Sequence, residues 1–544
     1  MADEFDLIVV GGGSAGCAMA GRLAEGGIHR VLLVEAGATD RHYRSRIPAL
    51  TSAVVQHPDF DWCYTTEPDE SLGGRSDVWP AGKRLGGGSA INGMMFIRGH
   101  AWDYDHWAEL GADGWDHASV LPYFRRMEDN ERGSDAWRGT GGPLSVSEGR
   151  ARYPITDAWI DAAVSAGIER SPDLNGRSAE GVDYVQTSQR AGLRWSSAAA
   201  YIHNSPHRQR LEVALEAQVL KILVEDGRAT GVVFSQNGQQ RTVRATGGVV
   251  LCAGAMNSPR MLMLSGIGPA AHLAEVGIPL VHDLPGVGRN LQDHVGTHLV
   301  NEVDAATLNA DVKGLRGAIQ VARFALSRRG ILTTSIAHAH AFVRSDPHYP
   351  APNLQIAFAA FAFDLDAQGR LVLRDKPSVS TLIGLMRTSH RGSITLRSAD
   401  PLAPPVIRHR LLGSDEDIDQ IVAGIGIARK IMAQPQIARY VTGEVRPGAV
   451  LQDAAALRDY VKMAAIPLYH PVGTCKIGRA DDEMAVLDPD LRVRGIDRLW
   501  VADASVMPSL PAGNTNATAI MIGDKGADHV LRTLRDNRIA RNAA

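Results

Sequence analysis

Neither sign of charge dominates this 544-residue chain, and that limits the partners it can attract. It has 57 lysine and arginine residues against 60 aspartate and glutamate residues, so its formal net charge is −3 at pH 7. Proteins that bind nucleic acid or anionic membranes through broad electrostatic attraction carry a clear excess of basic residues. The charge balance therefore predicts no nucleic-acid partner and no electrostatic footprint for an anionic membrane.

Long hydrophobic runs and paired cysteines are also missing. No stretch approaches the about 18 consecutive apolar residues of a transmembrane helix, so we expect no membrane span. Cys17, Cys63, Cys252 and Cys475 show no CxxC spacing, and we interpret them as free thiols of a reducing compartment. A strand-like segment begins by residue 5, which leaves no room for a signal peptide. These absences predict a cytoplasmic protein, with peripheral membrane association left open.

The chain is long and contains many glycine residues. At 544 residues it exceeds the size of a typical single hydrophobic core, so two domains are expected. Its 56 glycines suit tight turns and close approaches of the backbone to a bound cofactor. Apolar residues make up 44% and charged residues 22%, which is ordinary for a globular protein in water.

Residues 5–35 have the pattern of a dinucleotide-binding βαβ unit. Apolar and β-branched residues at 5–10 and 31–34 predict two buried strands, and small residues at 17–24 predict a helix between them. The first strand leads directly into Gly11-Gly12-Gly13-Ser14-Ala15-Gly16, a GxGxxG sequence. A glycine-rich turn alone is weak evidence, but here the strand before it and the helix after it agree.

Each of the three glycines in such a turn has a mechanical purpose. Gly11 permits the tight turn, Gly13 lets the backbone approach a pyrophosphate, and Gly16 lets the helix pack closely on the strand. The phosphates would lie at the helix N-terminus, where free N–H groups favour anions. Glu35 follows Gly16 by 19 positions, where its carboxylate can bind an adenosine ribose hydroxyl. The pattern predicts a dinucleotide site without distinguishing FAD from NAD.

A second glycine-rich block spans residues 82–96. Its core, Gly86-Gly87-Gly88-Ser89, can form a nest of backbone N–H groups around another part of an anionic cofactor. The alternative is a flexible linker. Because the flanking residues are apolar rather than rich in serine and glycine, we favour a structured cofactor loop.

Three motifs in this order resemble those of the glucose–methanol–choline (GMC) family of flavin oxidoreductases. Residues 82–105 resemble the first family signature, residues 254–268 resemble the second, and residues 286–294 are similar to a further family motif. The likeness extends over nearly the whole chain. It implies that the dinucleotide is FAD. It also implies a mixed α/β fold, with a Rossmann-type FAD-binding domain and a substrate-binding domain built on an antiparallel sheet.

The predicted domains are discontinuous in sequence. We assign residues 1–155, 195–300 and 466–544 to the FAD-binding domain. Residues 156–194 and 301–465 form the predicted substrate-binding domain, because glycine motifs thin out there and strand-like segments take their place.

Local patterns predict the main elements outside the βαβ unit. Residues 211–224, 229–234 and 241–245 are expected to form a small antiparallel sheet around the turn-forming Asn237-Gly238. Residues 36–80 are expected to form a long irregular loop, and the tail after residue 533 is expected to fray. Further predicted strands are 248–254, 337–344, 354–363, 379–386, 393–396 and 499–504, and a helix is predicted at 415–432.

The resemblance also implies which residues hold FAD. Val219 would offer backbone groups to the adenine, and Asp503 would meet the phosphate–ribityl part. Members that tether the flavin do so through a histidine immediately before the asparagine of the first signature. This chain has Ile91 before Asn92, so we expect non-covalent FAD. The predicted cofactor-binding residues are Gly11, Gly13, Ser14, Ala15, Gly16, Glu35, Ala36, Arg84, Gly87, Ser89, Asn92, Gly93, Met94, Val219, Ala253, Asp503, Ala504, Asn514 and Thr515.

Two short segments, residues 469–475 and 511–518, are the candidates for catalysis. Taken alone, a histidine in a proline- and glycine-rich turn is more often structural than catalytic. The resemblance changes this, because His470 matches the active-site histidine of the family and Asn514 matches its second active-site position, which is histidine or asparagine. In alcohol oxidation the flavin takes the hydride and the protein must take the hydroxyl proton. His470 is the expected base and Asn514 the residue that positions the substrate oxygen.

Other residues have competing interpretations. His338 and His340 lie two apart on a predicted strand and could form a metal pair, but further ligands are missing, so core or substrate-wall roles are favoured and no metal is predicted. Phe358, Phe361, Phe363 and Met386 could line an apolar pocket or simply form core. Glu302, Asp364 and Asp366 could neutralise a cationic substrate, although such residues are more often solvated loop charges.

The sequence therefore predicts an FAD-dependent enzyme that oxidises a primary alcohol to the aldehyde. It leaves open whether O₂ or a quinone reoxidises the flavin, which substrate is used and how many subunits assemble. The resemblance permits aliphatic, aryl and furan alcohols, pyridoxine-like heterocycles, polyethylene glycols and choline. A hydroxynitrile lyase of the same fold and a non-catalytic flavin-binding protein are the alternatives of other classes.

Overall fold

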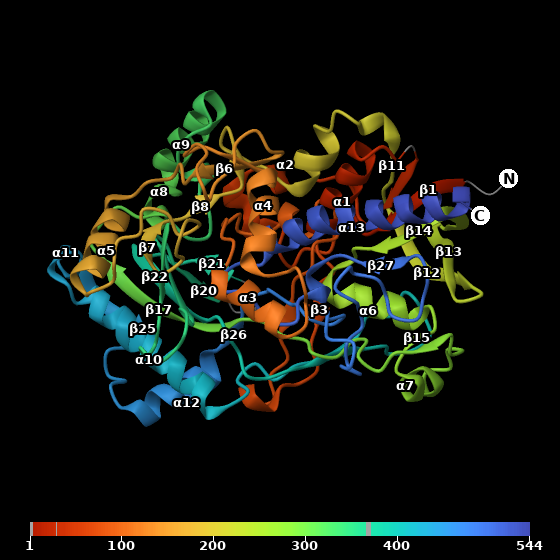
Figure 1. Ribbon diagram of the computed structural model, residues 1–544. Coiled ribbons are helices and arrows are strands. Elements are labelled where there is room, and N and C mark those ends of the chain that lie inside the picture. Colours follow the sequence, from red (N-terminus) through yellow and green to blue (C-terminus); the bar gives the residue numbers. More distant parts are fainter. Residues whose placement is uncertain (1–3, 29, 366–370, 544) are drawn as a thin grey trace.

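Two large sheets, each with its own hydrophobic core, organise the chain (Figure 1). This computed structural model describes residues 4–28, 30–365 and 371–543. One sheet is largely parallel and lies near the chain ends, and the other is antiparallel and lies at the opposite side of the molecule. The mixed α/β fold predicted from the sequence is confirmed.

The first sheet has the strand order β11-β2-β1-β14-β13-β12, and β27 pairs with β14. Its strands are β1 (Glu4–Val10), β2 (Val31–Val34), β11 (Leu211–Ala214), β12 (Ala217–Glu225), β13 (Arg228–Gln236), β14 (Gln239–Leu251) and β27 (Leu499–Val501). Parallel pairing joins β1 to β2 and β14, β2 to β11, and β14 to β27. The helices α1 (Ser14–Glu25) and α13 (Asn516–Ala543) lie side by side against this sheet, although they come from opposite ends of the sequence (Figure 1).

The antiparallel strands expected around Asn237-Gly238 are confirmed as β12, β13 and β14, but they extend the first sheet rather than form a small sheet of their own. β14 is 13 residues long, pairs with β13 through its first half and with β27 through its second, and so makes the hairpin part of the parallel sheet. The single strand expected at 211–224 is broken at residues 215–216, where Glu216 has a φ of +52° and donates its N–H to the carbonyl of Gly37. A positive φ is incompatible with a continuous strand.

The second sheet is antiparallel throughout, with the order β25-β17-β22-β19-β18-β7, and β26 pairs with β17. Its strands are β7 (Gly181–Tyr184), β17 (Val295–Val303), β18 (Ala339–Val343), β19 (Leu354–Ala359), β22 (Ser378–Leu385), β25 (Val441–Arg446) and β26 (Ile466–Pro467). Helices pack against it, among them α5 (Pro154–Ser165), α10 (Asp415–Met432) and α12 (Ala454–Ala464), and α11 (Pro435–Ala438) packs on α5 and α10. The predicted helix at 415–432 is confirmed to the residue, and the Ser414 hydroxyl caps it by accepting the Asp417 N–H.

The structure bears on three further predictions, which concern a domain boundary, the pairing of a strand and the C-terminal tail. The predicted domain boundary at residues 300 and 301 falls inside β17, and the domain division itself stays a prediction. The strand expected at 393–396 is present as β23 (Ser393–Thr395), but it pairs with β24 (Val406–Arg408) in a separate ribbon rather than in the second sheet. The tail expected to fray after residue 533 continues as α13 to Ala543.

The expected loop at 36–80 contains only short elements, and its buried aromatic residues are Phe60, Tyr64 and Trp79. Tyr64 donates its hydroxyl proton to the Asn257 side chain. No helix in the described ranges is long and apolar enough to cross a bilayer. The remaining elements are α2 (Tyr43–Arg46), η1 (Pro48–Ala53), β3 (Tyr64–Thr65), η2 (Glu70–Leu72), β4 (Val78–Trp79), η3 (Gly87–Ala90), α3 (Ala101–Glu109), α4 (His117–Met127), β5 (Glu128–Asn130), β6 (Leu144–Glu148), β8 (Gln186–Thr187), β9 (Gln189–Arg190), β10 (Leu193–Arg194), η4 (Ala199–His203), η5 (Arg208–Arg210), α6 (Gly254–Leu264), β15 (Ile267–Gly268), α7 (Ala270–Glu275), β16 (His282–Asp283), α8 (Leu308–Asp311), α9 (Gly314–Ser327), η6 (Ile331–Thr333), β20 (Phe363–Leu365), β21 (Leu371–Leu373) and η7 (Ala504–Val506).

Candidate active site

The turn between β1 and α1 requires glycine at two positions and has room for a Cβ atom at a third. Gly11 has a φ of +97°, and a Cβ there would lie 2.6 Å from the carbonyl oxygen of Cys252. A Cβ on Gly16 would lie 1.9 Å from the carbonyl oxygen of Gly11. At Gly13 the φ is −75° and the nearest heavy atom to a Cβ is 3.9 Å away, so protein contacts do not require glycine there. Protein packing therefore accounts for glycine at Gly11 and Gly16 but not at Gly13.

The N-terminus of α1 lies against the second glycine-rich loop. No side chain caps the helix at Gly13, and its first turn has no acidic residue, so its N–H groups can serve an anion. The Gly86 N–H donates to the carbonyl of Gly12 at 2.6 Å, and a Cβ on Gly87 would lie 2.6 Å from the Cα of Gly13. The two motifs, far apart in sequence, form one backbone-lined surface.

Glu35 lies buried at the end of β2 and beside the first glycine turn. Its Oε2 accepts the Gly12 N–H at 2.8 Å and its Oε1 accepts the Gly37 N–H at 2.7 Å. Burial outweighs these hydrogen bonds and raises the pKa of Glu35 to about 7. Each oxygen keeps a second lone pair for a ribose hydroxyl. Ala36 follows in the chain, and Val219 lies buried in β12 of the same sheet.

The loop at 84–94 is held in shape by its own side chains. Ser89 donates its hydroxyl proton to the carbonyl of Gly86 at 2.6 Å, and Asn92 Oδ1 accepts the Met94 N–H at 3.0 Å. Met94 has a φ of +63°, and the Gly93 that precedes it gives its carbonyl to Ser335 at 2.5 Å. Arg84, one of the predicted cofactor residues, stacks on the Phe60 ring at 3.9 Å, and its buried Nε has no hydrogen-bond partner among the described residues.

Arg194 organises this loop and was not predicted. Its buried guanidinium donates to the carbonyls of Ser45 at 2.7 Å and Ser89 at 3.1 Å, and to Asn92 Oδ1 at 2.8 Å. Burial lowers its pKa to about 9. No local pattern indicates this role, because the partners of Arg194 are about 100 to 150 positions away and half of them are backbone carbonyls.

Asp503 joins the end of β27 to the start of α6. Its Oδ2 accepts from the Gly254 N–H at 2.8 Å and from the Ser258 hydroxyl at 2.5 Å, and its Oδ1 accepts from the Ser505 N–H at 2.8 Å. Ala253 donates its N–H to the Ser258 oxygen, and Ala504 gives its carbonyl to the Gly473 N–H. Burial raises the pKa of Asp503. The carboxylate thus orders the ends of two strands and one helix.

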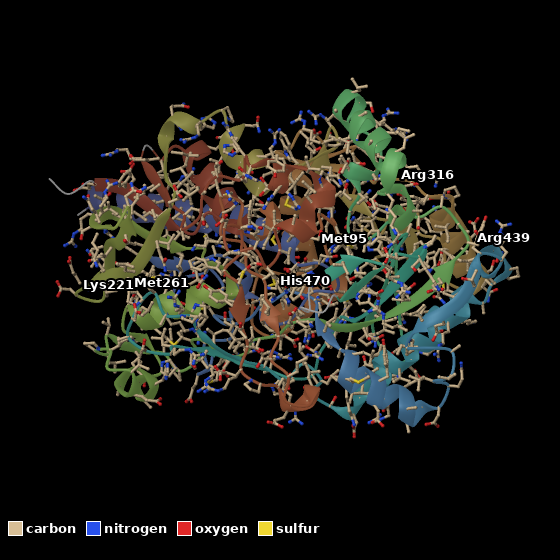
Figure 2. The ribbon with its side chains drawn as sticks, turned by 180° about the vertical axis from the view of Figure 1, so that it is seen from behind. Met95, Lys221, Met261, Arg316, Arg439 and His470 are labelled. Atoms are coloured by element: carbon tan, nitrogen blue, oxygen red, sulfur yellow. The ribbon has the colours of Figure 1, made fainter. Side chains whose placement is uncertain are left out.

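His470 and Asn514 come together from two loops 44 residues apart, near the centre of the molecule, where Figure 2 labels His470. The side-chain nitrogens Asn514 Nδ2 and His470 Nε2 lie 3.0 Å apart, with the amide as donor. Asn514 Oδ1 is buried and has no hydrogen-bond partner in the described part of the chain. A hydroxyl group that replaced this bond could donate to His470 Nε2 and accept from Asn514 Nδ2.

The motif at 286–294 builds the support for both catalytic loops. Asn290 Nδ2 donates to the carbonyls of Gly473 at 3.1 Å and Pro508 at 3.2 Å, which lie in the two different loops. Gln292 Nε2 also donates to Pro508, and Asp293 Oδ1 accepts the His470 N–H at 2.7 Å. The sequence identified this motif only by resemblance, whereas the structure shows what it holds.

A second histidine, His294, contacts His470 and was not predicted as a site residue. Their Nδ1 atoms lie 3.0 Å apart. Because His470 Nε2 accepts from Asn514, neutral His470 carries its proton on Nδ1 and donates it to His294. Burial lowers the pKa of His470 to about 4 and that of His294 well below its ordinary value. The pair is therefore neutral at pH 7, with the His470 Nε2 lone pair facing Asn514.

The predicted cofactor and catalytic segments meet at the start of α13. Ser14, at the N-terminus of α1, donates its hydroxyl proton to Asn516 Oδ1 at 2.7 Å. Thr515 is buried between Asn516 and Asn514. Gly513, which directly precedes Asn514, has a φ of +103°, and a Cβ there would lie 2.7 Å from the side chain of Ile97. Ala15 packs against the same helix, because a Cβ on Gly523 would lie 2.2 Å from its carbonyl oxygen.

The remaining candidates have structural partners. His338 Nε2 lies 2.9 Å from the Thr334 hydroxyl, and His340 Nδ1 lies 3.3 Å from the Gln355 amide. No group of three or more metal-ligating side chains occurs in residues 4–28, 30–365 and 371–543. Phe358, Phe361 and Met386 are buried, and Phe363 is partly buried against the core of the second sheet.

Two of the three acidic candidates, Glu302 and Asp364, are partners in ion pairs. Glu302 pairs with Arg374 at 3.0 Å and with Lys376 at 3.2 Å. Asp364 pairs with Arg374 and with Arg446, both at 2.9 Å. The third candidate, Asp366, lies outside the described residues. Neither of the two described carboxylates is free to neutralise a cationic ligand.

Comparison with known proteins identifies the family. The N-terminal profile of the GMC oxidoreductases matches residues 5–296 and the C-terminal profile matches residues 388–523. The oxygen-dependent choline dehydrogenase of Brucella suis biovar 1 (strain 1330) is 39% identical over 529 residues, which cover 97% of this chain and 96% of that protein. The enzyme of the same name from Rhizobium rhizogenes (strain K84) is 39% identical over 539 residues, 98% of this chain and 97% of that protein.

Solved structures agree with this assignment. Pyridoxine 4-oxidase from Mesorbium loti superposes with a TM-score of 0.86 at 28% identity, covering 96% of this chain and 98% of that one. A formate oxidase from Aspergillus oryzae RIB40, studied for FAD modification, superposes with a TM-score of 0.89 at 25% identity, covering 98% and 99%. The chain belongs to the GMC oxidoreductase family and is a flavin-dependent enzyme acting on CH–OH groups.

The residues present fit the FAD that this family binds. The uncapped N-terminus of α1, the free space at Gly13 and the buried carboxylate of Glu35 match the pyrophosphate and the adenosine ribose. The unpartnered Arg84 Nε and Asn514 Oδ1 are buried polar atoms that a polar ligand would satisfy. Hydrogen bonds join the segments that carry this fit: Glu35 bonds to the first glycine turn, that turn bonds to the second glycine loop, and Ser14 bonds to the start of α13.

Proposed function

We propose that this enzyme oxidises a primary alcohol to the aldehyde, with His470 as the proton acceptor and Asn514 as the residue that positions the hydroxyl. The observation that supports this most directly is the 3.0 Å separation of His470 Nε2 and Asn514 Nδ2. A hydroxyl oxygen within hydrogen-bond reach of both atoms can lose its proton to one while it accepts a bond from the other. Bound FAD would supply the hydride acceptor.

Each protein group has a separate task in this proposal. His470 is neutral at pH 7, so its Nε2 can take the hydroxyl proton without first losing one. Asn514 cannot act as a base, but its amide N–H stabilises the negative charge that develops on the oxygen. His294 and Asp293 hold the imidazole ring and its backbone in place. Anaerobic mixing with a panel of alcohols, followed by flavin absorbance, tests the reaction type and identifies a substrate.

The acid limb of the pH–rate profile is expected near pH 4 rather than near 6.5. Because burial lowers the pKa of His470 to about 4, the imidazole stays unprotonated and active well below the ordinary histidine pKa. The limiting rate of flavin reduction, measured by stopped flow between pH 4.5 and 9, checks this. A loss of reduction rate with an apparent pKa near 6.5 would contradict the assignment of His470 as a buried neutral base.

Acid also affects the fold, so the rate must be normalised to folded enzyme. The unfolded chain binds a proton at His470 near pH 6.5, whereas the folded chain binds it near pH 4. Unfolded protein therefore holds more protons in this window, and stability contributed by the neutral imidazole is lost as the pH falls from 6.5 toward 4. Circular dichroism at each pH separates unfolding from protonation of the base.

FAD is proposed to be bound without a covalent link. Ile91 is buried, and its hydrocarbon side chain has no nucleophile that could attach to a flavin. Precipitation of the holoenzyme with acid should therefore release all of the flavin absorbance into the supernatant. Yellow colour that stays with the washed pellet would show a covalent bond and overturn this expectation.

The substrate is proposed to be an uncharged primary alcohol, although the relatives at 39% identity are named choline dehydrogenases. Glu302 and Asp364 are neutralised by arginine and lysine, and both oxygens of Asp293 accept backbone N–H groups. We therefore expect choline to be oxidised no better than its uncharged tert-butyl analogue, in which carbon replaces the quaternary nitrogen. Comparison of kcat/KM for the two checks this, and a preference for choline of about 100-fold or more, about 2.7 kcal/mol, would contradict it.

We propose O₂ as the electron acceptor, with a quinone as the alternative. The relatives named oxygen-dependent choline dehydrogenase and the oxidases among the solved structures favour O₂ for this chain as well. Oxygen consumption with and without an artificial quinone distinguishes the two. Anaerobic bleaching of the flavin by substrate would exclude the hydroxynitrile lyase alternative, since that reaction transfers no electrons to the flavin.

A further inference from the structure

Helix α9 presents its apolar side to solvent. Leu315, Ile319 and Leu326 are 78%, 56% and 89% exposed, whereas Phe324, on the opposite side, is buried. Figure 1 shows α9 projecting from the margin of the molecule beside α8, and Figure 2 labels Arg316 on it. In a globular protein the apolar stripe of a helix ordinarily faces the core. Here the arrangement is reversed.

The exposed side chains form one continuous stripe. Four residues of the stripe follow one another at spacings of three or four positions, so they share one face of the helix. They are Leu315, Ile319, Ala322 and Leu326. Single exposed apolar residues are common, but a continuous row of large ones marks an interaction surface. We call this row the outer face of α9. Ile336, 46% exposed, lies shortly after the helix in the chain.

The same segment is strongly basic. Residues 312–345 contain no aspartate or glutamate, while α9 and its flanks carry Lys313, Arg316, Arg323, Arg328 and Arg329. Lys313 pairs with Asp375, and Arg328 stacks on the Phe324 ring. Arg316, Arg323 and Arg329 have no ion pair within the part of the chain that the structure describes. The net charge of −3 predicted no footprint for an anionic membrane, but a whole-chain sum hides a local cluster.

These features identify the occupant of the outer face. A helix with apolar side chains on one face and arginines along its edge lies in the plane of a lipid surface, with the arginines at the phosphate level. A second copy of this chain would bring the same basic residues together, which like-charge repulsion opposes. We propose that α9 docks the enzyme on an anionic lipid bilayer, with its outer face in the interfacial region.

Docking would bring lipid close to the cofactor loop. The chain leaves α9 at Arg328, passes through η6 and reaches Ser335, which donates its hydroxyl proton to the carbonyl of Gly93 at 2.5 Å. The neighbouring Ile336 packs on Gly93, where a Cβ would lie 2.3 Å from its side chain. The segment that covers this predicted cofactor residue therefore continues directly from the docking helix.

Flotation of the FAD-loaded, full-length enzyme with lipid vesicles tests the proposal. We expect binding to vesicles of phosphatidylcholine with phosphatidylglycerol and about 10- to 100-fold weaker binding to phosphatidylcholine alone, since each arginine near an anionic surface contributes roughly a factor of five. The triple substitution Arg316→Gln, Arg323→Gln and Arg329→Gln should weaken binding to anionic vesicles by about 100-fold. The triple substitution Leu315→Ser, Ile319→Ser and Leu326→Ser should abolish it.

A matched control separates docking from general surface hydrophobicity. Leu402, Val450 and Met463 are 63%, 91% and 71% exposed elsewhere on the molecule. Their triple substitution by serine should leave vesicle binding unchanged, and all three triple variants should retain FAD and turnover of a water-soluble alcohol. Equal flotation of the α9 serine variant and the wild type would overturn the proposal. So would a wild-type dimer, seen by analytical ultracentrifugation, that binds no vesicles and dissociates on substitution of the outer face.

Discussion

His470→Ala is expected to slow flavin reduction by about 10²- to 10⁴-fold per bound flavin, the range for losing one acid–base group. The enzyme would keep FAD, because His470 is not among the residues predicted to hold the cofactor, and its side chain contacts only Asn514 of that group besides His294. Stopped-flow absorbance under anaerobic conditions, with an alcohol identified in the panel, measures this rate. Reoxidation of chemically reduced enzyme should change less, because no alcohol proton is transferred in that half-reaction.

Two further variants distinguish catalysis from structure. His470→Gln keeps a polar side chain in the same space but has no basic nitrogen, so it should be as slow as His470→Ala while folding like the wild type. Asn514→Ala should also slow reduction, and the double variant should show less than the sum of the two effects, because both residues act on one oxygen. A wild-type rate per flavin in either His470 variant would remove this residue from the mechanism.

Gly13→Ala is expected to weaken FAD binding by about 5- to 150-fold with little change in the stability of the apoprotein. A Cβ at this position meets no protein atom closer than 3.9 Å, and the φ of −75° suits any residue. The methyl group would instead meet the pyrophosphate that approaches this turn, and overpacking of this kind costs about 1–3 kcal/mol. Titration of the apoprotein with FAD, followed by flavin fluorescence, measures the dissociation constant.

The control for this variant is Gly426→Ala. Gly426 lies exposed in α10, far along the chain from the glycine loops, and a Cβ there meets nothing within 4 Å. Alanine should leave FAD binding unchanged and raise stability slightly, because alanine is a better helix former than glycine. Alanine at Gly13 can cost up to about 1 kcal/mol as a poorer helix cap, so thermal unfolding of both apoproteins is compared. Wild-type FAD affinity in Gly13→Ala would show that the pyrophosphate does not approach this turn.

Local patterns predicted those elements whose neighbours in space are also neighbours in sequence. The unit β1-α1-β2 was readable because a buried parallel strand, a glycine turn and a helix of small residues each leave a local signature. Helix α10 was readable for the same reason, since Ser414 at its N-cap and three acidic residues in its first turn mark its start.

Predictions failed where pairing joins distant segments. β12, β13 and β14 were recognised as strands, but their membership of the parallel sheet depends on β1 and on β27, about 250 residues later. The alternation of side chains along a strand shows that it is half-buried and does not name its partner. The ion pairs of Glu302 and Asp364 were not predicted for a related reason, because the arginines that neutralise these carboxylates lie up to 82 positions away.

From the sequence alone, residue types at fixed short spacings predicted the glycine turns, and the resemblance of longer motifs indicated the family and implied the two residues proposed for catalysis. Only the tertiary structure decided that Asn290, Gln292 and Asp293 hold both catalytic loops, that His294 contacts His470, and that Arg194 orders the cofactor loop. It also decided that the apolar face of α9 points outward, since an amphipathic pattern is the same whether its apolar side meets a core or solvent. Spacing in the chain specifies what a residue can do, and packing between distant segments specifies which groups it meets.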